Sequence, residues 1–301
     1  MRSFLCFDVG GTFVKWGIIN ENGEILEESA YETPKDYKNF IARIENIYRN
    51  HVDIVNAIAI AVPGVCDLKE GKILFTPNIL YLRGKYIVND VKSFASDIFC
   101  TIANDANMAA LGECKFGDEN KYDNVTVITL GTGVGAGAVV NGKLFRGNIS
   151  PCEIGHITLV VDGQKCGCGK RGCFEAYCNS ASLQRYFKEF SGSSHNFEPI
   201  DIYRLAKNGN LIAKEVFKKY AYYLAHGLAN VANIFAPEVI KISGGLCEMM
   251  DMYIEDTLEY FDDLVYPAYR GWVEIKIATL KNRAGILGGA ALCSERLLDF
   301  A

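Results

Sequence analysis

The feature that most constrains the fold of this chain is one pattern that occurs twice: strand, glycine-rich turn, strand, Asn-Gly turn and strand. The predicted strands of the two copies are residues 3–7, 13–19 and 24–28, then 125–130, 136–140 and 143–145. Asn22-Gly23 and Asn141-Gly142 stand at equivalent places, and this dipeptide is typical of a type I′ hairpin turn. The repetition predicts two related halves that face each other.

Outside these hairpins, predicted strands alternate with predicted helices. The strands are residues 57–62, 98–103 and 239–242, and the helices are residues 37–49, 106–115, 181–189, 201–207, 213–235 and 284–298. The alternation predicts an α/β fold. A polar stretch at residues 117–123 is the expected domain boundary.

Composition excludes several classes of protein. The 301 residues are 50% hydrophobic with a net charge of −5, so we expect a globular protein that binds no nucleic acid. The apolar runs are far shorter than the roughly 20 residues of a membrane helix, and the N-terminus resembles no signal peptide. We therefore expect a cytoplasmic protein whose 11 cysteines are reduced.

One histidine and three cysteines lie close together in the sequence. They are His156, Cys166, Cys168 and Cys173, and glycines between them allow a tight loop. Four soft ligands with no obvious open position predict a tetrahedral, structural Zn²⁺ site. The same segment carries Glu153 and Glu175, so the metal would hold polar groups in place and leave the chemistry to others.

The first glycine turn follows the first strand. Asp8 is followed by Gly10, Gly11 and Thr12, whose backbone N–H groups and hydroxyl can approach phosphate oxygens. Asp8 is placed to hold Mg²⁺ through water. The simpler alternative is a plain hairpin turn.

The second glycine turn, with Gly131, Thr132 and Gly133, repeats this chemistry. It is neither a Walker A motif nor a dinucleotide fingerprint, because no Gly-Lys-Ser/Thr follows and a strand comes next in place of a helix. Paired with the first turn, it suggests a phosphate clamp with one part on each half.

Asn104 and Asp105 stand where a strand meets a helix. They can cap the helix, or Asp105 can act as a general base toward a hydroxyl that attacks phosphorus. The small-residue turns at Gly244-Gly245 and at residues 285–289 can border an adenine ring or serve close packing of helix and sheet.

Five blocks together resemble the ROK family (repressors, open reading frames, sugar kinases), in the order in which that family has them. They are Asp8-Val-Gly-Gly-Thr, Asn104-Asp105-Ala-Asn, Leu130-Gly-Thr-Gly-Val-Gly, Glu153-x-x-His156 and Cys166-Gly-Cys168-Gly-x-x-Gly-Cys173-x-Glu175. The resemblance runs from about residue 3 to about residue 293.

The resemblance implies an actin-like ATPase (ribonuclease H-like) fold of two lobes with a central cleft. The small lobe would be residues 1–117, with the helix at about 286–301 packed back on it, and the large lobe residues 118–285. It implies phosphorylation of a hexose or amino-sugar hydroxyl, usually at C6, with ATP and Mg²⁺.

The resemblance also assigns roles to residues. Asp105 is the implied catalytic base, and His156 holds zinc through one ring nitrogen and faces the sugar with the other. The implied sugar contacts are Gly64, Asn78, Asn104, Asp105, Glu153, His156 and Glu175. The implied contacts to MgATP are Asp8, Gly10, Gly11, Thr12, Gly131, Thr132, Gly133, Gly244 and Gly245.

Three functions are compatible with the sequence and its resemblance. The leading one is a glucokinase-like hexose kinase that works as a homodimer or homotetramer. The alternative is a kinase of N-acetylmannosamine or another amino sugar, because residues 76–86 lack the Trp common in glucokinases. A sugar-sensing regulator ranks last, because a repressor needs a helix-turn-helix domain and Asp8 stands almost at the start.

Overall fold

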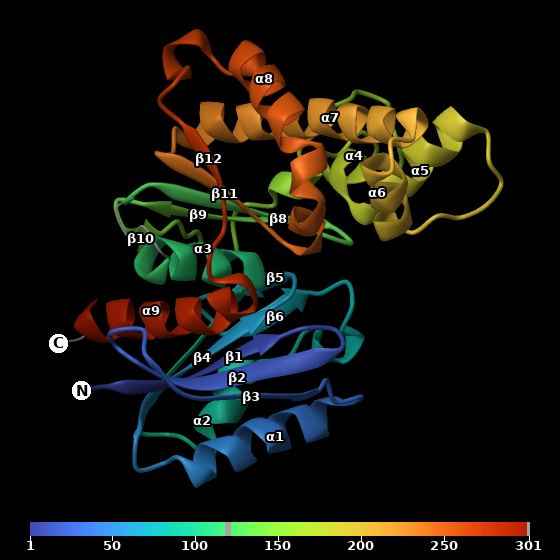
Figure 1. Ribbon diagram of the computed structural model, residues 1–301. Coiled ribbons are helices and arrows are strands. Elements are labelled where there is room, and N and C mark those ends of the chain that lie inside the picture. The colour runs from blue at the N-terminus through green and yellow to red at the C-terminus, as the bar shows by residue number, and fades with distance from the viewer. Residues whose placement is uncertain (118–121, 300–301) are drawn as a thin grey trace. The chain divides into compact units, whose positions relative to one another are not determined.

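Two five-stranded sheets organise the chain in the computed structural model, which describes residues 1–117 and 122–299 (Figure 1). The chain forms two compact units. Unit 1 comprises Met1–Asp123, Gly137–Cys152 and Thr279–Ala301, and unit 2 comprises Asn124–Ala136 and Glu153–Ala278. The predicted α/β class is confirmed. The lobe boundaries implied by the resemblance stay a prediction, and part of the polar stretch at 117–123 lies outside the described residues.

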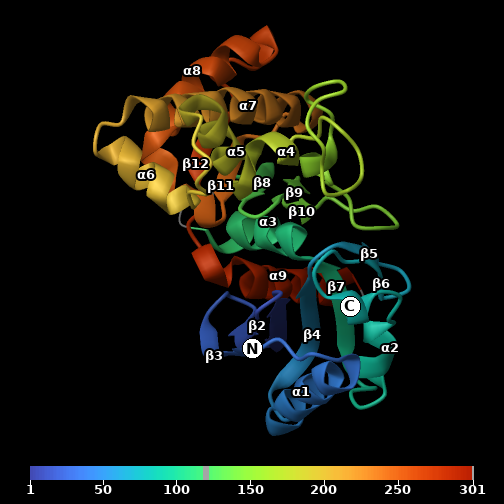
Figure 2. The ribbon, with the colours of Figure 1, turned by 90° about the vertical axis from the view of Figure 1, so that its right-hand side faces the viewer.

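The first sheet lies in unit 1 and has the order β3-β2-β1-β4-β7. Its strands are β1 Ser3–Val9, β2 Phe13–Asn20, β3 Ile25–Glu32, β4 Val55–Val62 and β7 Phe99–Asn104. The helices of the unit are α1 Tyr37–Asn50, α2 Ile87–Lys92, α3 Asp105–Phe116 and α9 Ala284–Asp299, and β5 Val65–Asp67 pairs with β6 Lys72–Phe75. In Figure 2, α1 lies on one side of the sheet and α9 on the other.

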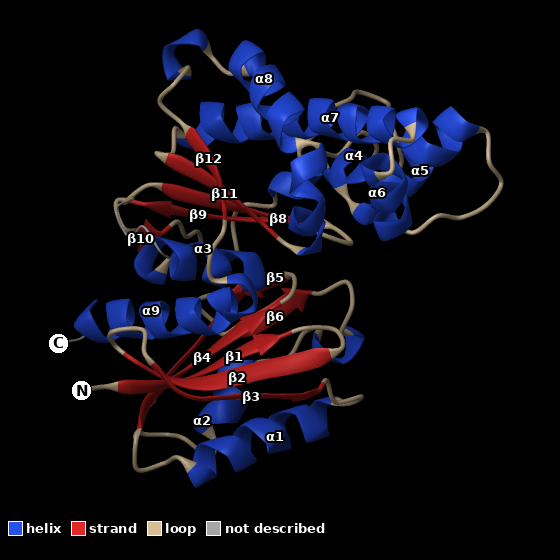
Figure 3. Ribbon diagram, viewed as in Figure 1, coloured by secondary structure: helices blue, strands red, loops and turns tan. Residues whose placement is uncertain are grey.

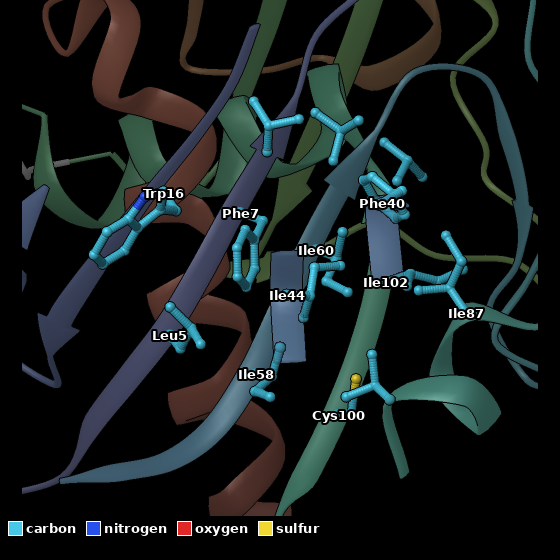
Figure 4. Packing of buried hydrophobic residues seen from close by; sticks show 14 of the residues in the cluster. Leu5, Phe7, Trp16, Phe40, Ile44, Ile58, Ile60, Ile87, Cys100 and Ile102 are labelled. Carbon is cyan, nitrogen blue, oxygen red and sulfur yellow. The ribbon is translucent and has the colours of Figure 1, made fainter. Parts of the chain in front are cut away.

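Strand β4 shows why the two faces of this sheet differ. Its sequence alternates alanine with isoleucine or valine, and successive side chains of a strand point to opposite faces. Ile58 and Ile60 join the large apolar core under α1, together with Phe7 and Phe40 (Figure 4). The alanines face α9, where a β-carbon added to Gly289 would lie 3.1 Å from the Ala59 β-carbon. Small side chains on both sides let the helix lie close to the sheet.

The second sheet has the order β10-β9-β8-β11-β12, drawn as red arrows in Figure 3. Its strands are β8 Val125–Leu130, β9 Val134–Val140, β10 Lys143–Leu144, β11 Val239–Ser243 and β12 Glu274–Ile277. The helices of unit 2 are α4 Glu175–Cys178, α5 Ser180–Ser191, α6 Pro199–Lys207, α7 Leu211–Phe235 and α8 Ile254–Leu264. The long α7 is the centre of this helical layer, because α4, α5, α6 and α8 all pack against it. In the described part of the chain, every helix is too short or too polar to cross a membrane.

The two Asn-Gly turns differ, although the sequence predicts type I′ for both. Asn141 and Gly142 both have positive φ, of 51° and 69°, as a type I′ turn requires. In the first turn only Gly23 has positive φ, so the prediction is wrong there. The Asn20 side chain explains the difference, because its Oδ1 accepts hydrogen bonds from the backbone of Asn22 and Glu24 and fixes a longer turn.

Candidate functional site

The parallel pairing of β1, β4 and β7 brings three predicted segments to one edge of the first sheet. In the register, Asp8 pairs with Ala61, and Val62 pairs with Asn104. The glycine turn after β1, the Gly64 turn after β4 and Asp105 after β7 therefore follow neighbouring carboxyl ends. Ligands of open α/β sheets bind at this kind of edge.

Asn104 is the N-cap of α3 and also ties two strand ends together. Its Oδ1 accepts the Asn107 backbone N–H at 3.1 Å, which is the capping bond that the sequence allows. Its Nδ2 donates to the Gly64 carbonyl at 3.0 Å. Gly64 has φ of 103°, and a β-carbon there would lie 2.1 Å from the Phe75 carbonyl oxygen, so only glycine fits.

Asp105 is the first residue of α3, and its side chain is half-buried. Its Oδ1 accepts the Ala106 backbone N–H at 2.9 Å, which holds the carboxyl group at the N-terminus of the helix. The helix dipole favours the ionised form of a carboxyl group at this end. The arrangement offers a fixed carboxylate oxygen at the sheet edge, as a general base requires.

The first glycine turn closes on itself and leaves donors free. The Gly10 N–H donates to the Phe13 carbonyl at 2.9 Å, and Thr33 binds the turn through its Oγ1 to Gly10 and its N–H to Thr12. In the described part of the chain, the N–H groups of Gly11 and Thr12 donate to no protein acceptor. Both residues are exposed, and so they can donate to a phosphate.

A cavity of about 570 Å³ in unit 1 is lined by this turn, by Thr33 and by the exposed Asn78. A β-carbon added to Gly11 would lie 3.9 Å from the Asn78 β-carbon, so the two residues are neighbours. The structure therefore brings Gly11, Thr12 and Asn78 to one cavity, although the resemblance assigns them to different ligands.

Asp8 lies opposite Lys15 on the neighbouring antiparallel strand. Burial raises the pKa of the Asp8 carboxyl, and the positive charge of Lys15 opposes that shift. Gly285 at the start of α9 packs on it, since a β-carbon there would lie 2.7 Å from Asp8 Cγ. A bound cation would stabilise the charged form of this buried carboxylate, which fits the predicted Mg²⁺.

The second sheet has a corresponding edge in unit 2. β8 and β11 are parallel, and Ser243 pairs with Thr129, so the turns after these strands are neighbours. Gly244 has φ of 95°, and a β-carbon there would lie 2.2 Å from the Leu130 carbonyl oxygen. The Gly131 N–H closes the second turn by donating to the Gly133 carbonyl at 3.0 Å.

The four predicted metal ligands converge. The ligand atoms of His156, Cys166, Cys168 and Cys173 all lie within 4.8 Å of one another. Cys166 Sγ lies 3.6 Å from His156 Nδ1, and Cys168 Sγ lies 3.7 Å from Cys173 Sγ. With Zn–S bonds of about 2.3 Å and a Zn–N bond of about 2.0 Å, tetrahedral geometry places N and S about 3.5 Å apart and two S atoms about 3.8 Å apart. The observed distances therefore fit zinc and leave His156 Nε2 for another partner.

Glu175 connects this cluster with the second glycine turn. Its Oε2 accepts the Val134 backbone N–H at 3.1 Å, and Cys166 Sγ lies 3.4 Å from its Oε1. A β-carbon added to Gly133 would lie 2.6 Å from the same Oε2. No local sequence pattern predicts this link, which couples the metal loop, the segment from His156 to Cys173 that carries the four ligands, to the turn.

Glu153 precedes the 3₁₀ turn Ile154–His156 and is exposed. Partial desolvation raises the pKa of its carboxyl, His156 lowers it, and the charge of Glu175 raises it. These three polar side chains thus belong to one electrostatic group in unit 2.

Two supporting residues were not predicted. Ser180 holds the second glycine turn, because its N–H and Oγ both bind the Gly131 carbonyl, at 2.8 and 2.9 Å. Thr33 holds the first glycine turn in the same way, because its Oγ1 and its N–H donate to carbonyl groups of that turn. Both follow their turns by more than 20 residues, so no local pattern could reveal them.

The described geometry defines a class: an α/β protein with a glycine turn at the carboxyl edge of each sheet, a carboxylate at a helix N-terminus and a metal-ligand loop. The family model "ROK family" matches residues 4–296, and the chain belongs to the ROK family. The structural relatives in this family have the actin-like ATPase fold, and this chain shares it.

Individual relatives support this assignment. A glucokinase of Streptomyces coelicolor is 31% identical over 96% of both chains. An N-acetyl-D-glucosamine kinase of Photobacterium profundum is 31% identical over 83% of this chain and 86% of its own. A ROK family glucokinase from Streptomyces griseus, solved with glucose and AMPPNP, matches with a TM-score of 0.78 at 31% identity, over 96% of this chain and 98% of that one.

Proposed function

We propose that this protein is an ATP-dependent, glucokinase-like sugar kinase that phosphorylates the C6 hydroxyl of a hexose. The observation that carries the proposal is the Asp105 carboxylate, which a hydrogen bond holds at the N-terminus of α3. The neighbouring Asn104 is fixed as well, because both its side-chain oxygen and its side-chain nitrogen make hydrogen bonds. The glucokinase relatives at 31% identity support it over nearly the whole chain.

In the proposed mechanism, Asp105 accepts the proton of the sugar hydroxyl. The hydroxyl oxygen forms a bond to the γ-phosphorus as the bond to the bridging oxygen breaks and ADP leaves. The free N–H groups of Gly11 and Thr12 donate to phosphate oxygens. Mg²⁺, when bound, neutralises phosphate charge, and Asp8 would hold it through water.

The sugar itself would be held in unit 2 by Glu153, His156 and Glu175. Carboxylates accept hydrogen bonds from sugar hydroxyls, and His156 has Nε2 available when Nδ1 binds the metal. Structural Zn²⁺ would position this group without touching the reacting atoms.

An amino-sugar kinase is the second candidate. The N-acetyl-D-glucosamine kinase relative is as similar in sequence as the glucokinase, although over a shorter range. We further propose a cytoplasmic homodimer or homotetramer, which sedimentation analysis of the purified protein would test.

The test is ADP release with MgATP across glucose, mannose, fructose, allose, N-acetylglucosamine and N-acetylmannosamine. One dominant sugar would name the acceptor. Asp105→Asn should lower turnover at least about a hundredfold and leave the calorimetric affinity for that sugar unchanged. The exposed Asp97→Asn is the matched control and should keep its rate. An Asp105→Asn protein that turns over normally would disprove the assigned base.

A further inference from the structure

Unit 2 contains a second cavity, of about 380 Å³, that has no part in the proposed reaction. Its walls come from the metal loop at residues 162–164 and Arg171, from Tyr177 on α4, and from α5 and α7. Every lining residue except Gly163 has a polar side chain. The cavity is thus unlike an apolar packing defect.

Three cations line this cavity: Arg171, Arg185 and Lys219. Arg185 is held in place, because its Nη2 donates to the Ala176 carbonyl at 2.8 Å and its guanidinium carbon lies 4.9 Å from the Tyr186 ring centre. Its Nε is buried and has no hydrogen-bond acceptor among the described residues. A guanidinium that is held by these contacts, and whose Nε has a carboxylate only at the 3.7 Å of an ion pair with Glu189, is suited to an anion.

The acidic groups of the cavity offset this charge only in part. Glu189 lies 2.8 Å from Lys219 Nζ and 3.7 Å from Arg185 Nε, and Asp162 is the other carboxylate of the lining. Three cations therefore face two carboxylates. Glu189 is exposed and stands on the surface of α5, so it can yield its place to a more highly charged anion.

The remaining wall is aromatic and supplies hydroxyl groups. Tyr177 and Tyr223 have ring centres 4.4 Å apart, and Tyr186 lies beside Tyr223 at 6.1 Å. Burial raises the pKa of the Tyr223 hydroxyl, so it stays protonated at neutral pH and can donate. Ring faces and hydroxyls together suit the polyhydroxyl part of a small phosphate ester.

We propose that this cavity binds a small phosphate monoester of about the size of a hexose phosphate, with its phosphoryl group on Arg171, Arg185 and Lys219. Two residues that line the cavity also make hydrogen bonds to the metal loop or to the segment just after it. The Tyr177 hydroxyl accepts the Gln164 N–H at 2.9 Å, two residues before Cys166, and Arg185 binds the carbonyl of Ala176, next to Glu175. A bound anion would therefore order the segment that carries Glu175, a regulatory role that rests on the proposed function.

Calorimetry on the zinc-loaded protein tests the binding directly. The probes are hexose 6-phosphate, glycerol 3-phosphate and inorganic phosphate, with glucose and AMPPNP present at saturating concentrations to occupy the proposed reaction site. Lys219→Gln should weaken the binding of hexose 6-phosphate about tenfold, because it removes a charged hydrogen bond. Glu189→Gln should tighten it, since the competing carboxylate is gone. Lys218→Gln, exposed and one residue away on α7, is the matched control and should change nothing.

The three probes and the variants distinguish the possible outcomes. Equal binding of all three probes would assign the cavity to the phosphate group alone, and preference for the hexose ester would assign the aromatic wall as well. Binding that is equal in Lys219→Gln and Lys218→Gln would overturn the proposal. Because the readout is heat of binding, these results hold even if no tested sugar is phosphorylated.

Discussion

At the scale of single residues, Asp8 is a carboxylate whose ionisation the fold opposes. Since burial raises its pKa, the group stabilises the fold at low pH and loses that contribution as pH rises through the folded-state pKa. Asp8→Asn should therefore melt a few degrees higher than the natural protein at pH 8, with a difference that shrinks toward pH 4. Thermal denaturation without Mg²⁺ across this range measures it.

Lys15 provides the control for this prediction. Its charge opposes the shift at Asp8, so Lys15→Gln should lower the melting temperature at pH 8, in the opposite direction. If Asp8→Asn were the less stable protein at pH 8, the carboxylate would be favoured in the fold and burial would not be the dominant cause. Asp8→Asn should also lose MgATP turnover, which would show stability exchanged for function.

At the scale of elements, the metal loop is predicted to be the part of unit 2 that depends most on a ligand. Removal of zinc should lower the unfolding free energy of unit 2 by about 3 kcal/mol, relative to a sample in which free zinc is present at a hundred times the dissociation constant of the site. Hydrogen exchange should rise at residues 153–178 and at the second glycine turn, because Glu175 binds Val134. Sugar affinity should fall with it.

Cysteine variants separate loss of the metal from loss of a thiol. Cys168→Ser removes one predicted ligand and should lower the bound zinc per chain, whereas the half-buried Cys247→Ser, far along the sequence, should keep it. A metal-free protein with unchanged exchange and unchanged sugar affinity would contradict the positioning role of the loop.

Elements with a strong local pattern could be predicted from the sequence, and the others could not. The metal ligands lie within 18 residues, so their spacing alone identifies them. Helix α8 was missed because only Thr257 and Phe261 of its residues are buried, which leaves a sparse periodic signal. The short strands β5, β6 and β12 were missed for a similar reason. The link from Glu175 to Val134 depends on tertiary folding across 41 residues, which no local pattern encodes.

At the scale of the whole molecule, unit 1 is assembled from three separate parts of the chain, and α9 closes it. A β-carbon added to Gly288 would lie 1.7 Å from the Met108 carbonyl oxygen of α3. Gly288→Ala should therefore cost about 3 kcal/mol or more of unfolding free energy, because a backbone group must move. Urea denaturation measures it.

Gly11→Ala is the matched control in the same unit. Its added β-carbon would meet only Asn78, at an ordinary 3.9 Å, so its unfolding free energy should stay within about 0.5 kcal/mol of the natural value. Equal costs for the two variants would mean that α3 and α9 do not pack as closely as described.

The return of α9 to the first sheet also sets an order of events during synthesis. The alanines of β4 that face α9 leave the ribosome more than 220 residues before Gly289, and until then nothing of α9 exists to cover them. The segments of unit 2 are complete by Ala278, before α9 has been made. Domains generally fold as they emerge, yet here the half of the protein that is begun first is the half that is finished last.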